Sequence, residues 1–348
     1  IVVGAVTISA RVVVVLAQDH QVRQVADVGD GFSQVVRQHV PETGLVVARV
    51  QERLVVPRPA GAVALVLLTL LWRWMISLSA WVAPARLPEL ELETISASHF
   101  VEKVRWCMDR LGVEYAERPV GGTLGAFYLG RSVPVLHFQT GAVRSSIGNS
   151  MEILRYLWGR YDCERGARAD FLASDDERLA LERRVDRCGV DLQVWVYHHL
   201  LDDRELTLHA WGCNSSRIPA WQRQALRVLY PLQAALIRKA FRITPGRHEK
   251  AVRHIDQLLA ETEEKLADGR GSILGGEEPN YTDFAFAAIM GLWLQPAAYG
   301  GGQADEVRIE RDRCPEPMIR EIERWEESYP LTTSFIERLY ADWRRPGG

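Results

Sequence analysis

The stretch LELETISASHFVEKVRWCMDRLG, residues 90–112, contains a strand, a turn and a helix in immediate succession. Residues 90–94 alternate apolar and polar side chains, a pattern typical of a half-buried strand. From Ser98 to Leu111 the apolar side chains recur at helical spacing, and Gly112 follows, a residue that commonly ends helices. We therefore expect a strand that leads directly into a helix at this point.

The residues after Gly112 continue the α/β pattern. We expect a strand at 113–120, a loop or poorly formed helix at 121–130, a strand at 133–138 and, after a turn at Gly141, a fourth strand and a helix at 150–161. The order β-α-β-(α)-β-β-α predicts one small α/β domain over residues 88–162. A domain of that size needs a partner to complete its core.

Nearly all of the chain after Ser174 is expected to be helical. Apolar residues at steps of three and four run from Leu181 to Trp195 and on to His199, as in a packed helix. Four further helical stretches follow, at 220–240, 247–266, 282–293 and 317–343. Residues 170–345 therefore form an all-α domain, and the chain is of the α+β class.

Ser98 lies where the first strand passes into the first helix, and its hydroxyl has two interpretations. The N–H groups and the positive dipole end of a helix N-terminus favour an anion, so the hydroxyl would donate a hydrogen bond to a thiolate there. Serine is equally a good helix N-cap, with Glu102 supporting the first turn. The sequence alone leaves both roles open.

Two further dipeptides are candidates for ligand contact. Val133-Pro134 opens a strand; a cis bond would turn the backbone of Val133 towards an extended peptide, whereas a trans bond would suit an ordinary edge strand. Asn149 and Ser150 begin the last helix of the α/β domain, either as ligands for a carboxylate and an amine or as caps.

Asn280 and Asp283 resemble a capping box at the start of an apolar helix, with Asp in place of the usual Glu or Gln. We expect this pair to serve folding.

Together, these motifs resemble the cytosolic glutathione S-transferase superfamily, over about residues 90–343. Ser98 with Lys103 five residues later is similar to the first-helix signature of its serine-type members, and Val133-Pro134 to its cis-proline strand. Asn149-Ser150 is similar to the element that binds the γ-glutamyl end of glutathione, and the Asn280–Asp283 region to the capping motif of the helical domain. The resemblance implies a thioredoxin-like α/β domain followed by an all-α glutathione-transferase-type domain.

The resemblance also implies a function. Glutathione would be the co-substrate, with its thiolate conjugated to a small electrophile, and Ser98 would be the catalytic residue. The binding residues would be Arg131, Val133, Pro134, Asn149 and Ser150. The electrophile pocket would lie between the domains, lined from the helix that bears Trp195, Tyr197 and His198, and the chain would be a homodimer.

Two departures from the family pattern matter. Asn149 stands where the family usually has an acid, which removes a charge from the site for the amino group of glutathione. Val101 occupies the second redox position of thioredoxin-like proteins, so a dithiol mechanism is not expected. A non-catalytic binding or interaction module, or a glutathione-dependent reductase or dehalogenase, therefore remains an alternative to conjugation.

Composition excludes other classes of function. With 42 Lys+Arg against 45 Asp+Glu and no basic block, nucleic acid is not an expected partner. The five cysteines include no C-x-x-C pair and indicate a reducing compartment. No metal is expected: the adjacent His198 and His199 have no cysteine or carboxylate at matching spacing.

The first 83 residues differ from the rest. Residues 1–60 are rich in valine and have no assigned function. Residues 61–83 are apolar apart from one charge, Arg73. A segment of this kind can be a membrane-spanning or interfacial helix, a core helix or a leader. We expect a cytoplasmic protein, with membrane contact through residues 61–83 as one alternative.

Overall fold

The computed structural model describes residues 61, 63, 64, 66–68, 71, 89–122, 133–140 and 143–344. The predicted extension at 1–60 lies outside the described residues, and so does most of the apolar segment at 61–83. Within the part of the chain that is described, no helix is both long enough and apolar enough to cross a bilayer.

Among the described residues, those at 89–122, 133–140 and 143–165 form the α/β part of the fold, which begins with the strand and helix at 90–112. The strands are β1 (Leu90–Thr94), β2 (Ala116–Pro119), β3 (Val135–Thr140) and β4 (Val143–Gly148), and the helices are α3 (His99–Leu111) and α5 (Ser150–Arg165). Helix α3 ends where expected, at Gly112, which adopts a left-handed conformation with φ 69°.

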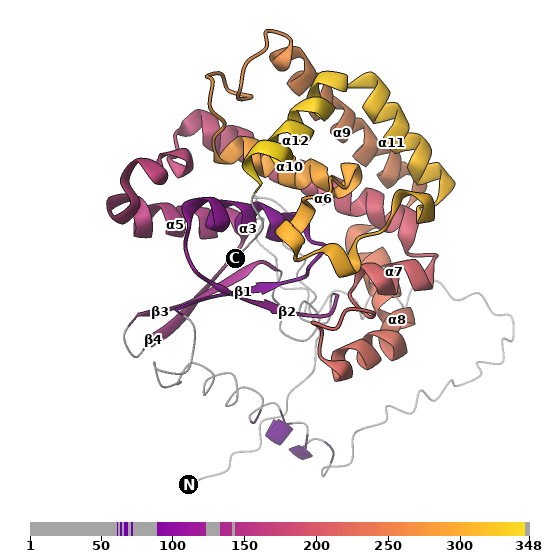
Figure 1. Cartoon of the computed structure of the whole chain (residues 1–348). Coiled ribbons are helices and arrows are strands. Elements are labelled where there is room, and N and C mark those ends of the chain that lie inside the picture. The colour runs from indigo at the N-terminus through magenta and orange to yellow at the C-terminus, as the bar shows by residue number, and fades with distance from the viewer. Residues whose placement is uncertain are drawn as a thin grey trace, which may run out of the picture. The chain divides into compact units, whose positions relative to one another are not determined.

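The described strands form one sheet in the order β2-β1-β3-β4. Strand β1 pairs in parallel with β2 and antiparallel with β3, and β3 pairs antiparallel with β4. Helices α3 and α5 lie side by side on one face of this sheet (Figure 1). A parallel βαβ unit followed by a β-hairpin and a helix is the thioredoxin-like arrangement, so this part of the predicted fold is confirmed.

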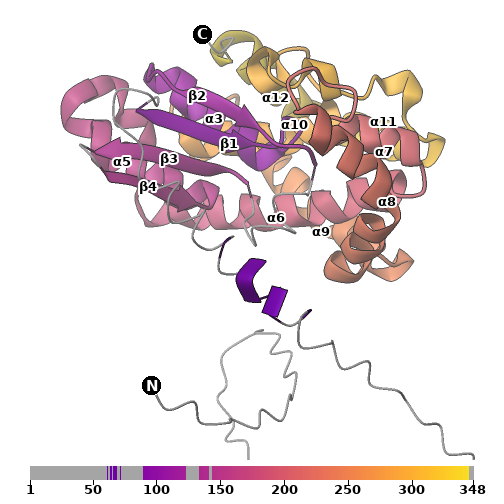
Figure 2. The same cartoon turned by 90° about the horizontal axis from the view of Figure 1, so that it is seen from below.

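The remaining elements are helical, which confirms the predicted α+β class. They are α6 (Asp176–Leu200), α7 (Arg204–Ala210), α8 (Ala220–Phe241), α9 (Pro245–Leu266), α10 (Tyr281–Leu294), α11 (Glu316–Ser328) and α12 (Pro330–Trp343), with short 3₁₀ turns between some of them. Figure 2 shows these helices gathered beside the sheet.

Helix α10 lies at the centre of the core and explains its uniformly apolar sequence. It packs against α3, α6 and α12, so residues from Tyr281 to Gly291 are buried on every side. At its start, Asn280 accepts a hydrogen bond from the Thr282 N–H, and the Asp283 carboxylate accepts one from the Asn280 N–H at 2.8 Å. The predicted capping box is present, and its role here is structural.

Helix α3 is joined to distant parts of the chain by buried charged side chains. Lys103, with no exposed side-chain surface, lies 2.7 Å from the Glu182 carboxylate and 2.9 Å from that of Asp186, both on α6. On the other side of the helix, Glu102 pairs with Arg344 at 2.7 Å, again with both side chains fully buried. These ion pairs fix α3, and with it the residue that precedes it, against the helical domain.

Candidate functional site

Three connecting segments meet at one end of the sheet. The end of β1 lies beside the start of β3, because Glu93 pairs with Val135, and the end of β4 lies beside the same residue, because Val135 pairs with Gly148. The residues that follow β1, precede β3 and follow β4 therefore adjoin one another. The sheet register alone brings Ser98, Val133–Pro134 and Asn149–Ser150 to this end.

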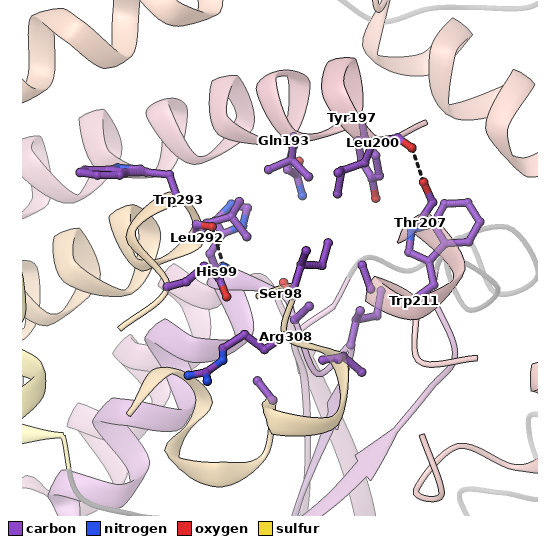
Figure 3. Close-up of a pocket in the computed structure, with 18 of the residues that line it drawn as sticks. Ser98, His99, Gln193, Tyr197, Leu200, Thr207, Trp211, Leu292, Trp293 and Arg308 are labelled. Carbon is purple, nitrogen blue, oxygen red and sulfur yellow. Dashed lines mark hydrogen bonds between the residues drawn. The ribbon is translucent and has the colours of Figure 1, made fainter. Parts of the chain in front are cut away.

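A cavity of about 410 Å³ opens between this end of the sheet and the helices. Ser98 and Val133 line it from the α/β domain, while Val196, Tyr197 and Leu200 line it from α6. Figure 3 shows Ser98 among side chains contributed by α6, α7 and the segment around Arg308. Most of the other lining residues are apolar, including Ile237, Phe241, Leu292, Val307, Met318 and Ile322.

Ser98 occupies the N-cap position of α3, but its hydroxyl does not cap the helix. Its backbone is extended (φ −75°, ψ 123°) and its carbonyl accepts the Glu102 N–H at 2.9 Å. The hydroxyl makes no side-chain capping hydrogen bond, nor any other hydrogen bond to the described residues. The side chain is half-buried and lines the cavity, so its O–H is free to donate to a ligand.

The Val133–Pro134 peptide bond is cis, which is the alternative that the family resemblance implied and that the dipeptide alone left open. Val133 is half-buried and lines the cavity, whereas Pro134 is buried beside the start of β3. Arg131, the predicted partner of a carboxylate, lies outside the described residues.

Asn149 and Ser150 lie at the start of α5, as predicted, but they do not line the cavity. The Asn149 side chain accepts a hydrogen bond from the Met151 N–H at 3.0 Å and therefore caps the helix. Its φ of 71° is nevertheless rare for a residue other than glycine, and such conformations concentrate at binding sites. Asn149 is exposed and Ser150 is buried.

His99, at the same end of the sheet, is buried, which its position in the first turn of a helix did not indicate. The imidazole is 2% exposed, and its Nε2 lies 3.0 Å from the carbonyl oxygen of Gly189 on α6. Gly189 permits this approach, because an added Cβ would lie 3.1 Å from His99 Nε2 and 2.8 Å from the Phe100 ring. Burial lowers the pKa of His99 to about 3, although the bond to Gly189 opposes this shift.

This lowered pKa makes the stability of the fold dependent on pH. Because the unfolded chain binds a proton at His99 below about pH 6.5 and the folded chain does not, acid favours unfolding. At pH 5 the free energy of unfolding should be about 2 kcal/mol lower than at pH 8 through this group alone. Urea unfolding of wild type and His99→Gln at both pH values measures the free energies of unfolding. The loss of stability between pH 8 and pH 5 should be smaller in the variant by the amount that His99 contributes. An equal loss in both proteins would contradict it.

The expectation that the helix bearing Trp195, Tyr197 and His198 lines the pocket is confirmed for part of that helix. Tyr197 lines the cavity, and burial raises the pKa of its hydroxyl to about 12, so it stays protonated. Trp195 is buried in the core, and His198 does not line the cavity; its ring instead stacks on that of His248 at 4.0 Å. Gln193 and Leu200, one turn to either side of Tyr197, also line the cavity from α6.

The structure also assembles three side chains that could hold a metal ion. His199, His248 and Glu321 come from α6, α9 and α11, and their ligand atoms lie within 4.8 Å of one another. The sequence spacing around His198 and His199 indicated no such partners, because His248 and Glu321 are brought close by helix packing.

No protein-family model and no curated protein matches this sequence. One similar solved structure is a glutathione S-transferase from Methylobacterium radiotolerans in complex with glutathione sulfonate. It is 16% identical in sequence, the match covers 74% of this chain and 96% of that chain, and the TM-score is 0.43. A glutathione S-transferase from Methylobacillus flagellatus with glutathione bound is 14% identical, covers 74% and 99%, and has a TM-score of 0.40. A theta class glutathione S-transferase from Xanthomonas axonopodis pv. citri is 19% identical, covers 72% and 97%, and has a TM-score of 0.35.

Proposed function

We propose that this chain, which combines a thioredoxin-like domain with an all-α domain, binds glutathione and conjugates its thiolate to a small apolar electrophile. The observation that carries the proposal is the Ser98 hydroxyl, which lies at a helix N-terminus, faces a cavity and has no hydrogen-bond partner among the described residues. A capping serine would have used its oxygen on the helix.

Ser98 would act by stabilising the thiolate form of glutathione. A free thiol has a pKa of about 8.5, so it is mostly protonated near neutral pH. Lowering that pKa by about two units requires roughly 2.7 kcal/mol of preferential interaction with the thiolate. A hydrogen bond donated by the Ser98 hydroxyl to the sulfur and the positive end of the α3 dipole can together supply an interaction of this size.

The remaining contacts would hold the glutathione peptide along the end of the sheet. The Val133 backbone, beside the cis Pro134, would pair with the extended peptide. Asn149 and Ser150 would hold the γ-glutamyl end, and Arg131 would bind the glycyl carboxylate. We also propose a homodimer, as the resemblance implies.

The cavity indicates the kind of electrophile. Its walls are formed mainly by aliphatic and aromatic side chains, among them Trp211, Phe241 and Trp293. Such walls favour an apolar or aromatic substrate whose reactive carbon is directed towards Ser98. An activated aryl chloride is therefore a suitable first substrate.

Glutathione binding tests the proposal at Asn149. Titration calorimetry should show one site per chain, and Asn149→Asp should bind glutathione up to about tenfold more tightly, because a carboxylate pairs with the γ-glutamyl ammonium better than an amide does. Aspartate also caps helices well, so α5 should remain intact. Asn214→Asp, on an exposed turn far along the chain, adds the same charge as a control.

Two results would overturn the glutathione site. One is the absence of binding at millimolar glutathione, which would favour the alternative of a non-catalytic interaction module. The other is an equal gain in affinity in Asn149→Asp and Asn214→Asp, which would show only a general effect of charge.

A further inference from the structure

We propose that His199, His248 and Glu321 bind a divalent transition-metal ion such as Zn²⁺, at a site that fastens α6, α9 and α11 together. The proposal is independent of the proposed glutathione chemistry. It rests on the geometry of these three side chains, on the burial of the two histidines and on the long contact between the His248 imidazole and Glu321.

The distances from Glu321 Oε2 to the two imidazoles match the spacing of ligand atoms around a metal, and they are long for hydrogen bonds, although His199 and Glu321 do share one at 3.3 Å. Glu321 Oε2 lies 3.3 Å from His199 Nε2 and 3.4 Å from His248 Nε2. Hydrogen bonds from N–H to oxygen are normally about 2.7–3.2 Å long. In a tetrahedral zinc site with bonds of about 2.0–2.1 Å, neighbouring ligand atoms are roughly 3.3–3.4 Å apart.

The Nε2 atom of His248, a residue that is only 9% exposed, lies 3.4 Å from Glu321 Oε2 and makes no hydrogen bond of normal geometry to the described residues. A buried imidazole nitrogen with only this long contact is available to bind a metal. The ring of His199 stands perpendicular to that of His248, with centroids 5.1 Å apart. The two rings therefore approach the same point from different directions.

Surrounding residues hold the ligands in place. Trp195 donates its indole N–H to Glu321 Oε2, as outer-shell residues commonly do for a ligating carboxylate. The ring of His198 stacks on that of His248 and limits its rotation.

The ligand set indicates the class of metal and its coordination. Two imidazoles and one carboxylate suit zinc and its neighbours in the first transition row, rather than Mg²⁺ or Ca²⁺. The His199 and His248 side chains are 6% and 11% exposed, whereas that of Glu321 is 25% exposed, so solvent reaches the site from the carboxylate side. A water molecule would therefore complete the coordination there.

The site would act on the cavity through the helices that it joins. Leu200 follows His199 on α6 and Ile322 follows Glu321 on α11, and both side chains line the cavity. A metal that binds three helices would keep these walls at a fixed separation.

Zinc binding by the full-length chain, with any polyhistidine tag removed, tests the proposal. Competition with a chromophoric chelator should show one Zn²⁺ per chain with a micromolar or lower Kd, and Zn²⁺ should raise the Tm. Glu321→Gln and His248→Gln should each weaken zinc binding by about 100-fold or more, since loss of an outer-shell partner alone commonly costs 10- to 100-fold. Co²⁺ at the site should show the intense visible absorption of a four-coordinate ion.

His254→Gln is the matched control. His254 lies on α9 like His248, but its Nδ1 is 2.9 Å from Asp191 and it is not in the cluster. This variant should bind zinc as wild type does, and circular dichroism of the metal-free proteins establishes that all variants fold. The proposal is overturned if wild type binds zinc no more tightly than the Glu321→Gln/His248→Gln double variant, or if His254→Gln loses affinity equally.

Discussion

Ser98→Ala should reduce kcat/KM for conjugation of glutathione to an activated aryl chloride by about 100-fold or more. This is the usual effect of removing one preorganised donor from an active site. The pKa seen in the pH–rate profile should rise towards that of free glutathione, because the variant no longer stabilises the thiolate. Glutathione affinity should change less, since the peptide contacts lie elsewhere.

Stability separates this catalytic role from a capping role. A capping serine replaced by alanine costs about 0.5–2 kcal/mol, but the Ser98 hydroxyl makes no capping bond, so Ser98→Ala should unfold at nearly the wild-type urea concentration. Ser96→Ala is the matched control, because Ser96 lies in the same turn but does not line the cavity. Unchanged kinetics together with a clear loss of stability would identify Ser98 as a cap. Ser98→Cys provides a second probe: with glutathione disulfide as the oxidant, a cysteine facing the glutathione site should form a mixed disulfide and release one equivalent of glutathione.

Lys103→Met should lower the free energy of unfolding by about 3–5 kcal/mol, the largest effect on stability that we expect for a single substitution in this chain. The Lys103 ammonium is fully buried between the carboxylates of Glu182 and Asp186. Removing it leaves Asp186 without a cation among the described residues and the buried Glu182 with only the partly exposed Arg155, which costs far more than the pair contributes. The midpoint of urea unfolding measures the change.

Arg184→Met is the corresponding surface control. Arg184 lies on α6 near Glu182 in sequence and pairs with Glu261, but both side chains are about half exposed. Exposed pairs contribute about 0–1 kcal/mol, so this variant should unfold near the wild-type midpoint. Equal midpoints for Lys103→Met and wild type would show that the buried cation is dispensable.

The parts of the fold that were predictable are those set by local patterns. The alternation at 90–94, the apolar spacing up to Leu111 and the stop at Gly112 all depend on residues close together in sequence. The Asn280–Asp283 capping box is equally local and was predicted as structural. The alternative that Ser98 is only a cap was not resolved by sequence, because the same residue type serves both roles.

The parts that were not predictable depend on contacts between distant segments. His99 is at the start of α3, where helices usually meet solvent, and its burial results from the close approach of α6 at Gly189. Glu102 and Lys103 follow it as charged residues, which commonly indicate an exposed helix face, yet their partners come from α6 and from Arg344. The metal-ligand cluster likewise joins His199 to a glutamate 122 residues away.

The ion pair between Glu102 and Arg344 constrains the order in which the protein forms during synthesis. The two residues are 242 positions apart, and Arg344 also lies 2.7 Å from Asp109 on the same helix. At a translation rate of about 5–20 residues per second, α3 waits roughly 10–50 s on the ribosome before Arg344 is made. Until then Arg105 of the same helix is the only cation of the described residues that pairs with Glu102, so we expect the contacts between α3 and Arg344 to be among the last to form.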